Sequence, residues 1–326
     1  MEPIAPGPGP DPQSLTSNHY RLDTCVTQLS AIFLNILAPV FMLVLIGYIV
    51  GPRLQIDARS VSRIAYYLLA PAFLFNVISR ANIEAGLALR MTVYILIVTL
   101  VTALLAFLAA RALDGPPELI AAYVLIAAFG NVGNFGFPII QFKYGQDALA
   151  WASLYFLILS TAGFVIGVGA AAWTRGGGPS SVLAVFKTPA IVAAIPAFLF
   201  NGLEIPLPLF LDRVIVLLSG ALIPIMLLTL GIQLAGVAQI RIDRHVVLSG
   251  LIRLVVGPAL ALLLAGPFAV SGLARGTGVL QAAMPTAVLA MLIALEHDLM
   301  PDFVTTVVLF STVVSALTLT VVLAIV

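Results

Sequence analysis

The sequence predicts an all-α polytopic membrane protein, and three observations lead to this fold class. Hydrophobic residues make up 61% of the chain and charged residues 9%, against roughly 45–50% and 25% in soluble domains. The chain also divides into ten apolar segments separated by polar or turn-forming residues. Finally, helix-breaking residues recur in matching segments of the two halves of the chain. We therefore expect ten transmembrane helices in two five-helix repeats.

The first thirty residues differ from the rest of the chain. Residues 1–30 are rich in Pro, Gly, Ser and Thr and lack apolar periodicity, which predicts a disordered N-terminal tail. The first apolar run, 31–50, is 20 residues long and is not followed by a small-residue cleavage pattern. We therefore expect a membrane helix there and not a signal peptide.

The ten apolar segments define the domain organisation. The longest polar gap, 174–186, is a short linker that separates a first repeat, 31–173, from a second repeat, 187–326. The segments are approximately 31–50, 60–80, 88–113, 118–143, 149–173, 187–203, 209–236, 246–268, 277–296 and 302–326.

The two halves carry prolines at matching places. Pro71 and Pro224 lie in the second segment of each half, and Pro138 and Pro285 lie in the fourth. Because five segments is an odd number, the second half enters the membrane from the opposite side, an arrangement that recurs among secondary transporters. The alternative is chance, since prolines are common in membrane helices.

Residues 130–138 read Gly-Asn-Val-Gly-Asn-Phe-Gly-Phe-Pro inside the fourth segment. In a helix interior Gly costs about 1 kcal/mol and Pro about 3 kcal/mol relative to Ala. Continuous helix is therefore not expected here. Irregular backbone at membrane depth is tolerated where it is buried in protein or lines a watery cavity, so the break indicates a place where something polar binds.

Both breaks carry a side-chain amide at the same position. Asn134 and Gln281 each lie four residues before a proline, and proline frees the carbonyl four residues earlier. An amide and a free carbonyl suit a carboxylate, a hydroxyl or a small cation, and half-helix N-termini favour anions. The alternative is that the two amides only satisfy the broken backbone.

Four runs of the sequence resemble the auxin efflux carrier family of transporters. They are PAFLFNVIS at 71–79, GNVGNFGFPI at 130–139, LQAAMPTAVLAMLIA at 280–294 and VVLFSTVVSALTLTVVL at 307–323. The family includes plant carriers and bacterial malonate and malate permease-type members, and the chain resembles the latter. The resemblance implies two inverted five-helix repeats whose broken fourth and ninth helices cross. It also implies secondary active or facilitative transport of small organic anions, and an architecture similar to that of the bile-acid transporter and sodium/proton antiporter families.

The resemblance also implies site residues. It assigns Asn131, Asn134 and Pro138 to the first crossover, and Gln281 and Pro285 to the second. Phe135, Gly136 and Phe137 separate Asn134 from its proline, a departure from the plant carriers, so auxin itself is not the expected substrate. The complete set of predicted substrate-binding residues is Asn131, Gly133, Asn134, Gly136, Pro138, Gln281, Pro285, Thr286 and Arg253.

Charged residues bear on substrate and coupling. Arg253 lies inside the eighth segment, where it either pairs with an anionic substrate or snorkels to the interface. No Asp or Glu falls within 119–143 or 277–295, so a proton-binding carboxylate is not expected at either break. Sodium coupling, proton coupling and uniport all stay open, as does a second copy of the chain as a partner.

Other function classes fit poorly. A net charge of +1 gives no reason to expect a nucleic-acid partner, and one cysteine with three dispersed histidines predicts neither a metal site nor a cofactor. No aspartate or histidine falls deep in a predicted span, so an enzyme is not expected. The alternatives are a sodium-coupled organic anion symporter of the bile-acid type and a non-transporting receptor.

Basic residues predict the orientation. Loops after odd-numbered segments hold eight Lys and Arg residues and the opposite side holds six. This excess favours both termini outside a cell (inner) membrane that the chain crosses several times.

Overall fold

The computed structural model describes residues 27–175, 189–236 and 241–326, and within these ranges the regular structure is helical apart from one isolated β-bridge. Seven helical segments in the described ranges are long and apolar enough to cross a membrane. They are Thr27–Arg53, Ala58–Ser79, Ala85–Ala112 (α5), Gln146–Gly167, Leu209–Ala235 (α11), Arg244–Ala265 and Pro301–Ile325 (α16). The prediction of an all-α, multi-pass membrane protein is confirmed.

The remaining named elements either subdivide or overlap these segments or complete the fold between them. They are η1 (Phe33–Leu37), α2 (Ala38–Arg53), α3 (Ala58–Ile64), η2 (Ala65–Leu69), α4 (Ala70–Ser79), α6 (Pro117–Ala128), η3 (Val132–Gly136), α7 (Phe137–Tyr144), η4 (Gln146–Ala148), α8 (Leu149–Arg175), α10 (Pro189–Gly202), α12 (Arg244–Leu251), η6 (Ile252–Val256), α13 (Gly257–Ala265), α14 (Gly272–Ala282) and α15 (Val288–His297).

Two predicted boundaries can be compared with these elements. Residues 27–30, which the sequence assigns to the tail, belong to the helix Thr27–Arg53. An apolar helix can extend into the polar interface, and composition does not mark that point. The rest of the tail, 1–26, and linker residues 176–186 lie outside the described residues.

Four π-helical turns share one sequence feature. Each of η1, η2, η3 and η6 is followed, two residues after its end, by a proline at the second position of the next α-helix. Proline has no N–H to donate to the carbonyl four residues earlier, and a wider turn is one way to absorb that lost bond. Helix continues on both sides of each of these prolines.

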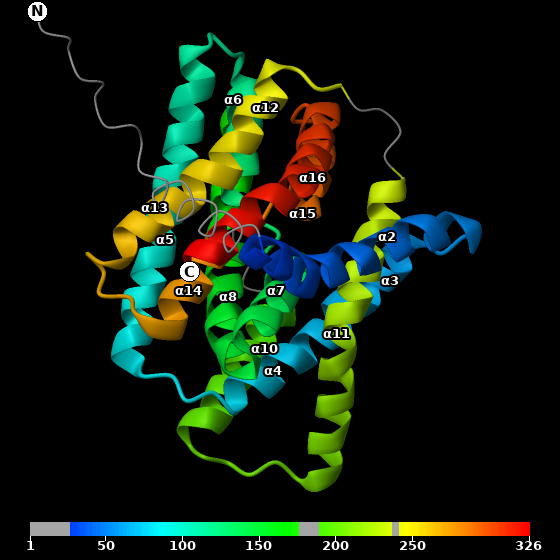
Figure 1. The fold of residues 1–326 in the computed structure, drawn as a ribbon, viewed down its shortest axis with the longest axis vertical. Helices are drawn as coiled ribbons and strands as arrows, with labels where there is room; N and C mark the ends of the chain where they lie inside the picture. The colour runs from blue at the N-terminus through cyan, green and yellow to red at the C-terminus, as the bar shows by residue number, and fades with distance from the viewer. Residues whose placement is uncertain (1–26, 176–188, 237–240) are drawn as a thin grey trace, which may run out of the picture.

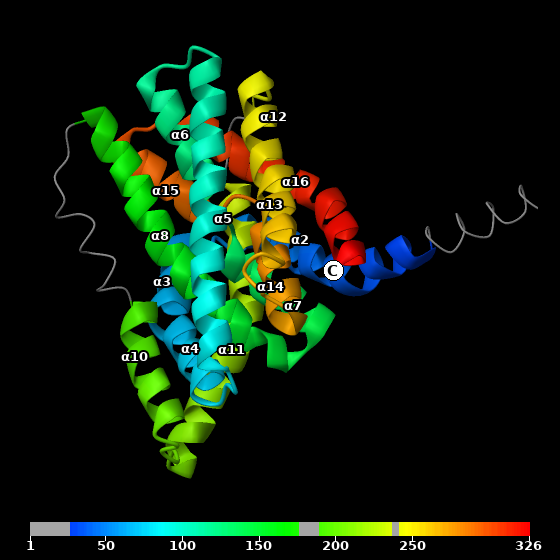
Figure 2. The ribbon, with the colours of Figure 1, turned by 90° about the vertical axis from the view of Figure 1, so that its left-hand side faces the viewer.

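The helices pack in two groups. We call α2, α4, α10 and α11 the panel, because α11 packs against α2 and α4, and α10 packs against α4. The bundle contains α5, α6, α7, α8, α12, α13, α14, α15 and α16. In Figure 1, α2, α3 and α11 lie on the right, and α5, α6, α12 and α13 lie on the upper left. Figure 2 shows α3, α4, α10 and α11 below the ends of α6, α12 and α15.

Glycines bring the two long panel helices into close contact. A Cβ on Gly47 of α2 would lie 2.9 Å from the Cα of Leu228 in α11, and one on Gly231 would lie 2.6 Å from the backbone nitrogen of Tyr48. Small residues at a membrane helix interface allow this close approach of two backbones. An ion pair also joins two panel helices at one end: Arg80, just after α4, pairs with Asp212 of α11.

Candidate functional site

The two predicted breaks are present and lie against each other. In the first, α6 ends at Ala128 and helix resumes at Val132; in the second, α14 ends at Ala282 and α15 begins at Val288. An antiparallel bridge pairs Gly130 with Thr286. The hydrogen bonds that flank this bridge join the two irregular segments, so each break satisfies backbone groups that the other leaves without a helical partner.

Two backbone hydrogen bonds form this junction. The N–H of Asn131 donates to the carbonyl of Pro285 at 2.7 Å, and the N–H of Ala287 donates to the carbonyl of Phe129 at 2.9 Å. A side chain of α16 supports the second break, because the Ser311 hydroxyl oxygen accepts the N–H of Thr286 at 3.1 Å. Sequence reasoning missed Ser311, since small hydroxyl residues are frequent in membrane helices.

The prolines play different parts in the two breaks. Pro138 is the second residue of α7, which directly follows the π-helical turn η3, so helix continues through it from Val132 to Tyr144. Pro285 lies in the extended segment, after α14 has ended. The expectation of a free carbonyl at Gln281 is wrong, because that oxygen accepts the N–H of Met284 at 3.3 Å and lies 3.5 Å from Nη2 of Arg253. The helix ends before the proline could free this carbonyl.

Arg253 lies at the junction of the breaks. Its side chain is only 4% exposed. Nε donates to the carbonyl of Met284 at 2.9 Å, and Nη1 donates to the carbonyl of Ala127 at 3.0 Å. The snorkelling interpretation is therefore wrong: the guanidinium lies among carbonyl groups at the C-terminal ends of α6 and α14, where helix dipoles place partial negative charge.

Two glycines make room for these side chains. A Cβ on Gly130 would lie 2.7 Å from Cζ of Arg253, and a Cβ on Gly136 would lie 2.8 Å from Cδ of Gln281. Gln281 is fully buried; its Nε2 donates to the carbonyl of Ala152 at 3.5 Å, while its Oε1 has no hydrogen-bond partner. Any larger residue at either glycine displaces a buried polar side chain.

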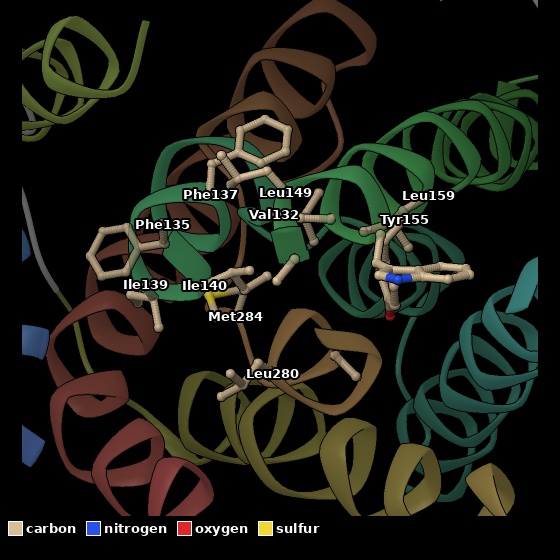
Figure 3. Close-up of a cluster of buried hydrophobic side chains, with 14 of the residues drawn as sticks. Val132, Phe135, Phe137, Ile139, Ile140, Leu149, Tyr155, Leu159, Leu280 and Met284 are labelled. Carbon is tan, nitrogen blue, oxygen red and sulfur yellow. The ribbon is translucent and has the colours of Figure 1, made fainter. Parts of the chain in front are cut away.

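Apolar side chains from both breaks pack together beside the junction. Figure 3 shows Val132, Phe135 and Phe137 from the first break in one cluster with Leu280 and Met284 from the second. The aromatic rings also contact the panel. The ring centroids of Phe135 and Phe41 are 5.3 Å apart, and those of Phe137 and Phe73 are 4.8 Å apart. These contacts fix the irregular backbone between the panel and the bundle.

A cavity of about 230 Å³ lies where panel and bundle meet beside the breaks. Three predicted site residues, Asn131, Gly133 and Asn134, line it. The other six do not; they are Gly136, Pro138, Gln281, Pro285, Thr286 and Arg253. The Thr286 hydroxyl is fully buried and has no hydrogen-bond partner. Sequence spacing therefore located the breaks but did not separate residues that line the cavity from residues that support it.

The polar part of the cavity wall is neutral. Asn131 is 4% exposed, and its Nδ2 has no hydrogen-bond partner. Ala287, Val288 and Leu289 place the start of α15 on the same wall. Within the described ranges, no Asp, Glu, Lys or Arg lines the cavity. The start of a helix and an unpartnered amide N–H are both suited to an anionic ligand.

Other lining residues come from elements that the sequence did not connect with the site. Tyr66 comes from η2, Met226 and Gln233 come from α11, and Phe156 and Phe164 come from α8. Gln233 donates from Nε2 to the hydroxyl oxygen of Ser62 at 3.0 Å, while its Oε1 is unpartnered. No local motif identifies these residues, because only the packing of distant segments brings them to one cavity. In the part of the chain that the structure describes, no cluster of three His, Cys, Asp or Glu residues suited to a metal occurs.

The sequence profile of the membrane transport protein family matches residues 32–169 and 174–323, which contain both breaks and all the cavity-lining residues. The chain belongs to this family, which is also called the auxin efflux carrier family. The resemblance seen in the sequence is confirmed at the level of the family. This transporter is thus a member of a transport family and not of an enzyme class.

Two archaeal relatives span nearly the same length. The transporter is 29% identical over 295 residues to an uncharacterized transporter from Methanothermobacter thermautotrophicus, with 86% of this chain and 94% of the relative covered. It is 24% identical over 277 residues to an uncharacterized transporter from Methanocaldococcus jannaschii, with 82% and 90% covered. Neither name states a substrate.

Proposed function

We propose that this transporter carries small organic anions across the membrane by alternating access, with the substrate bound in the cavity beside the joined breaks. One observation carries the proposal: the bridge between Gly130 and Thr286 brings the amide of Asn131 and the first turn of α15 to the same cavity wall. Carboxylate oxygens would accept hydrogen bonds from the Asn131 amide and from backbone N–H groups of the helix start.

The composition of the cavity wall supports an organic anion. Phe129, Phe156 and Phe164 offer apolar surface for the carbon part of a ligand, and Asn134 offers a second amide. The described lining contains no carboxylate that would repel an anion. A monocarboxylate or dicarboxylate of the malonate and malate type fits this chemistry. Secondary active and facilitative transport are both compatible with the same site.

We further propose that the chain crosses the membrane ten times as two inverted repeats. Each of the two broken passes would be built from two short helices, α6 with α7 and α14 with α15. The antiparallel direction of the bridge is the relation that an inverted repeat requires. The panel contains the first two passes of each half, and the bundle contains the last three.

This division suggests how access alternates. Panel helices α4, α10 and α11, together with η2 that precedes α4, line one side of the cavity, and bundle helices α8 and α15, together with η3 that precedes α7, line the other. Movement of the bundle against the panel would open the cavity to one side of the membrane at a time. The excess of basic residues after odd-numbered passes supports both termini outside a cell (inner) membrane.

Transport by purified protein in liposomes tests the proposal. We expect saturable uptake of at least one labelled mono- or dicarboxylate, competition by unlabelled anion, and a rise in the apparent melting temperature with the same anion. Protein-free liposomes and liposomes with Asn131→Asp protein are the controls, since a carboxylate at position 131 would repel an anionic substrate. Binding without uptake would instead favour a receptor, and uptake of neutral or cationic solutes alone would contradict the anion assignment.

A further inference from the structure

The guanidinium of Arg253 occupies a site with the properties of a cation site. Three carbonyl oxygens surround it: those of Met284 at 2.9 Å, Ala127 at 3.0 Å and Gln281 at 3.5 Å. These groups come from two separate passes and lie at or just beyond the C-terminal ends of α6 and α14. Backbone carbonyl oxygens are hard ligands that also suit sodium.

The charge at this site has a clear origin. Each helix C-terminus carries partial negative charge equivalent to about half an elementary charge. Two such ends that converge at membrane depth need a compensating cation, because water is not available there to screen them. Arg253 is 4% exposed, and no Asp or Glu of the described residues forms an ion pair with it. The carbonyl groups are therefore its counter-charge.

The guanidinium also fills the space available. The backbone of Gly130 packs against it so closely that a Cβ would lie 2.7 Å from Cζ. Arg253 does not line the substrate cavity, so its charge lies at the junction of the two breaks and outside the cavity wall. The substrate is thus free to meet the N-terminal ends of half-helices while Arg253 neutralises the C-terminal ends.

We propose that Arg253 is a built-in replacement for a coupling cation, and that the transporter consequently works without sodium. The statement that transport is independent of sodium rests on the proposed function. The occupied cation site itself is a property of the substrate-free protein. Arg253 is accordingly a positioning residue, which holds the crossed half-helices in register and leaves no site at their C-terminal ends for a sodium ion.

The test measures sodium-dependent stability of purified protein without substrate. Melting temperatures of the wild type, Arg253→Lys, Arg253→Gln and Arg90→Gln are recorded in sodium chloride and in choline chloride at equal ionic strength. Arg90 is an exposed arginine of α5 and controls for loss of one positive charge. We expect no sodium effect on the wild type, on Arg253→Lys or on Arg90→Gln. Arg253→Gln should melt at a lower temperature in choline and recover part of that loss as sodium is raised.

Several outcomes would overturn the inference. One is a saturable, sodium-specific rise in the melting temperature of the wild type. A second is an Arg253→Gln protein that is as stable as the wild type. A third is an Arg253→Gln protein that is destabilised but does not respond to sodium. Either result would show that the Arg253 side chain does not replace a cation. If Arg253→Gln cannot be purified, sodium-dependent stability of Arg253→Lys overturns the inference and its absence supports it.

Transport in the same two salts provides a second readout. Wild-type uptake should have equal rates in sodium and in choline, and uptake by Arg253→Gln should fall in choline and rise with sodium. A wild type that carries no organic anion but shows no sodium response contradicts the proposed function and leaves the cation site intact. A wild type that carries organic anions only with sodium supports the proposed function and contradicts the inference about Arg253.

Discussion

The guanidinium of Arg253 lies against the Cα of Gly130, in the space where any other residue would place its Cβ. The two residues belong to different passes, and each limits the other. A side chain at position 130 would move the guanidinium away from the carbonyls of Ala127 and Met284, which it contacts at 3.0 and 2.9 Å. Loss of those contacts leaves buried carbonyl groups without donors.

Gly130→Ala is therefore expected to destabilise the protein and to abolish transport. Overpacking of a close contact costs about 1–3 kcal/mol, and each carbonyl left unpaired adds about 1–3 kcal/mol. Gly266→Ala is the matched control, because Gly266 is exposed and a Cβ added there would have no neighbouring atom within 4 Å. Melting temperatures and uptake rates measure both effects. Equal behaviour of the two variants would contradict the close contact.

The two predicted amides should respond differently to mutation. Asn134 lines the cavity, whereas Gln281 is buried outside it against Gly136. We expect Asn134→Ala to raise KM by about tenfold or more, since a hydrogen bond to a charged group contributes about 1.5–3 kcal/mol. Gln281→Leu should leave KM near the wild-type value. Equal increases of KM in both variants would place Gln281 in the substrate site.

The close packing of α2 and α11 predicts a position-dependent effect of glycine substitution. Gly231→Leu should lower the melting temperature strongly, because even its Cβ would lie 2.6 Å from the backbone nitrogen of Tyr48. Gly220 lies on the same helix, is exposed, and has open space beyond it. Gly220→Leu should be well tolerated in detergent or lipid. A similar loss of stability in both variants would show that helix propensity, and not the panel contact, sets the effect.

Transport of a permanently charged substrate should depend little on pH. Within the described residues, no Asp or Glu lines the cavity, and an unperturbed carboxylate is already ionised between about pH 6 and pH 8. Glu296 lies in the last turn of α15, whose first residues line the cavity, and it is exposed. Uptake of a sulfonate analogue across this range tests the expectation. A steep pH dependence that disappears in Glu296→Gln would demonstrate proton coupling.

Local composition was sufficient to predict much of the fold. Apolar segments located the helices, and glycines with Pro138 located the first break. Helix α14 already ends at Ala282, before Pro285, so the proline spacing wrongly predicted a free carbonyl at Gln281. The bridge satisfies backbone groups through tertiary contact, and helix propensity does not report on such contacts.

The role of Arg253 shows the same limit more sharply. A single arginine in an apolar segment is compatible with snorkelling or with substrate contact, because hydropathy carries no information on its neighbours. Its carbonyl partners lie 31 and 126 residues away in the chain. Likewise, Gln233 and Phe156 line the cavity only because the panel and the bundle meet there.

The bridge between Phe129–Asn131 and Pro285–Ala287 has a consequence for biosynthesis. The first break is made long before the second emerges from the ribosome, and until then its exposed N–H and C=O groups have no partner within the bilayer. During synthesis of about 150 further residues, at roughly 5–20 residues per second, the first break must be shielded by the insertion machinery or lie near the membrane interface. A chain cut before Gly272 should therefore insert poorly and be degraded, even though it contains every residue of the first break.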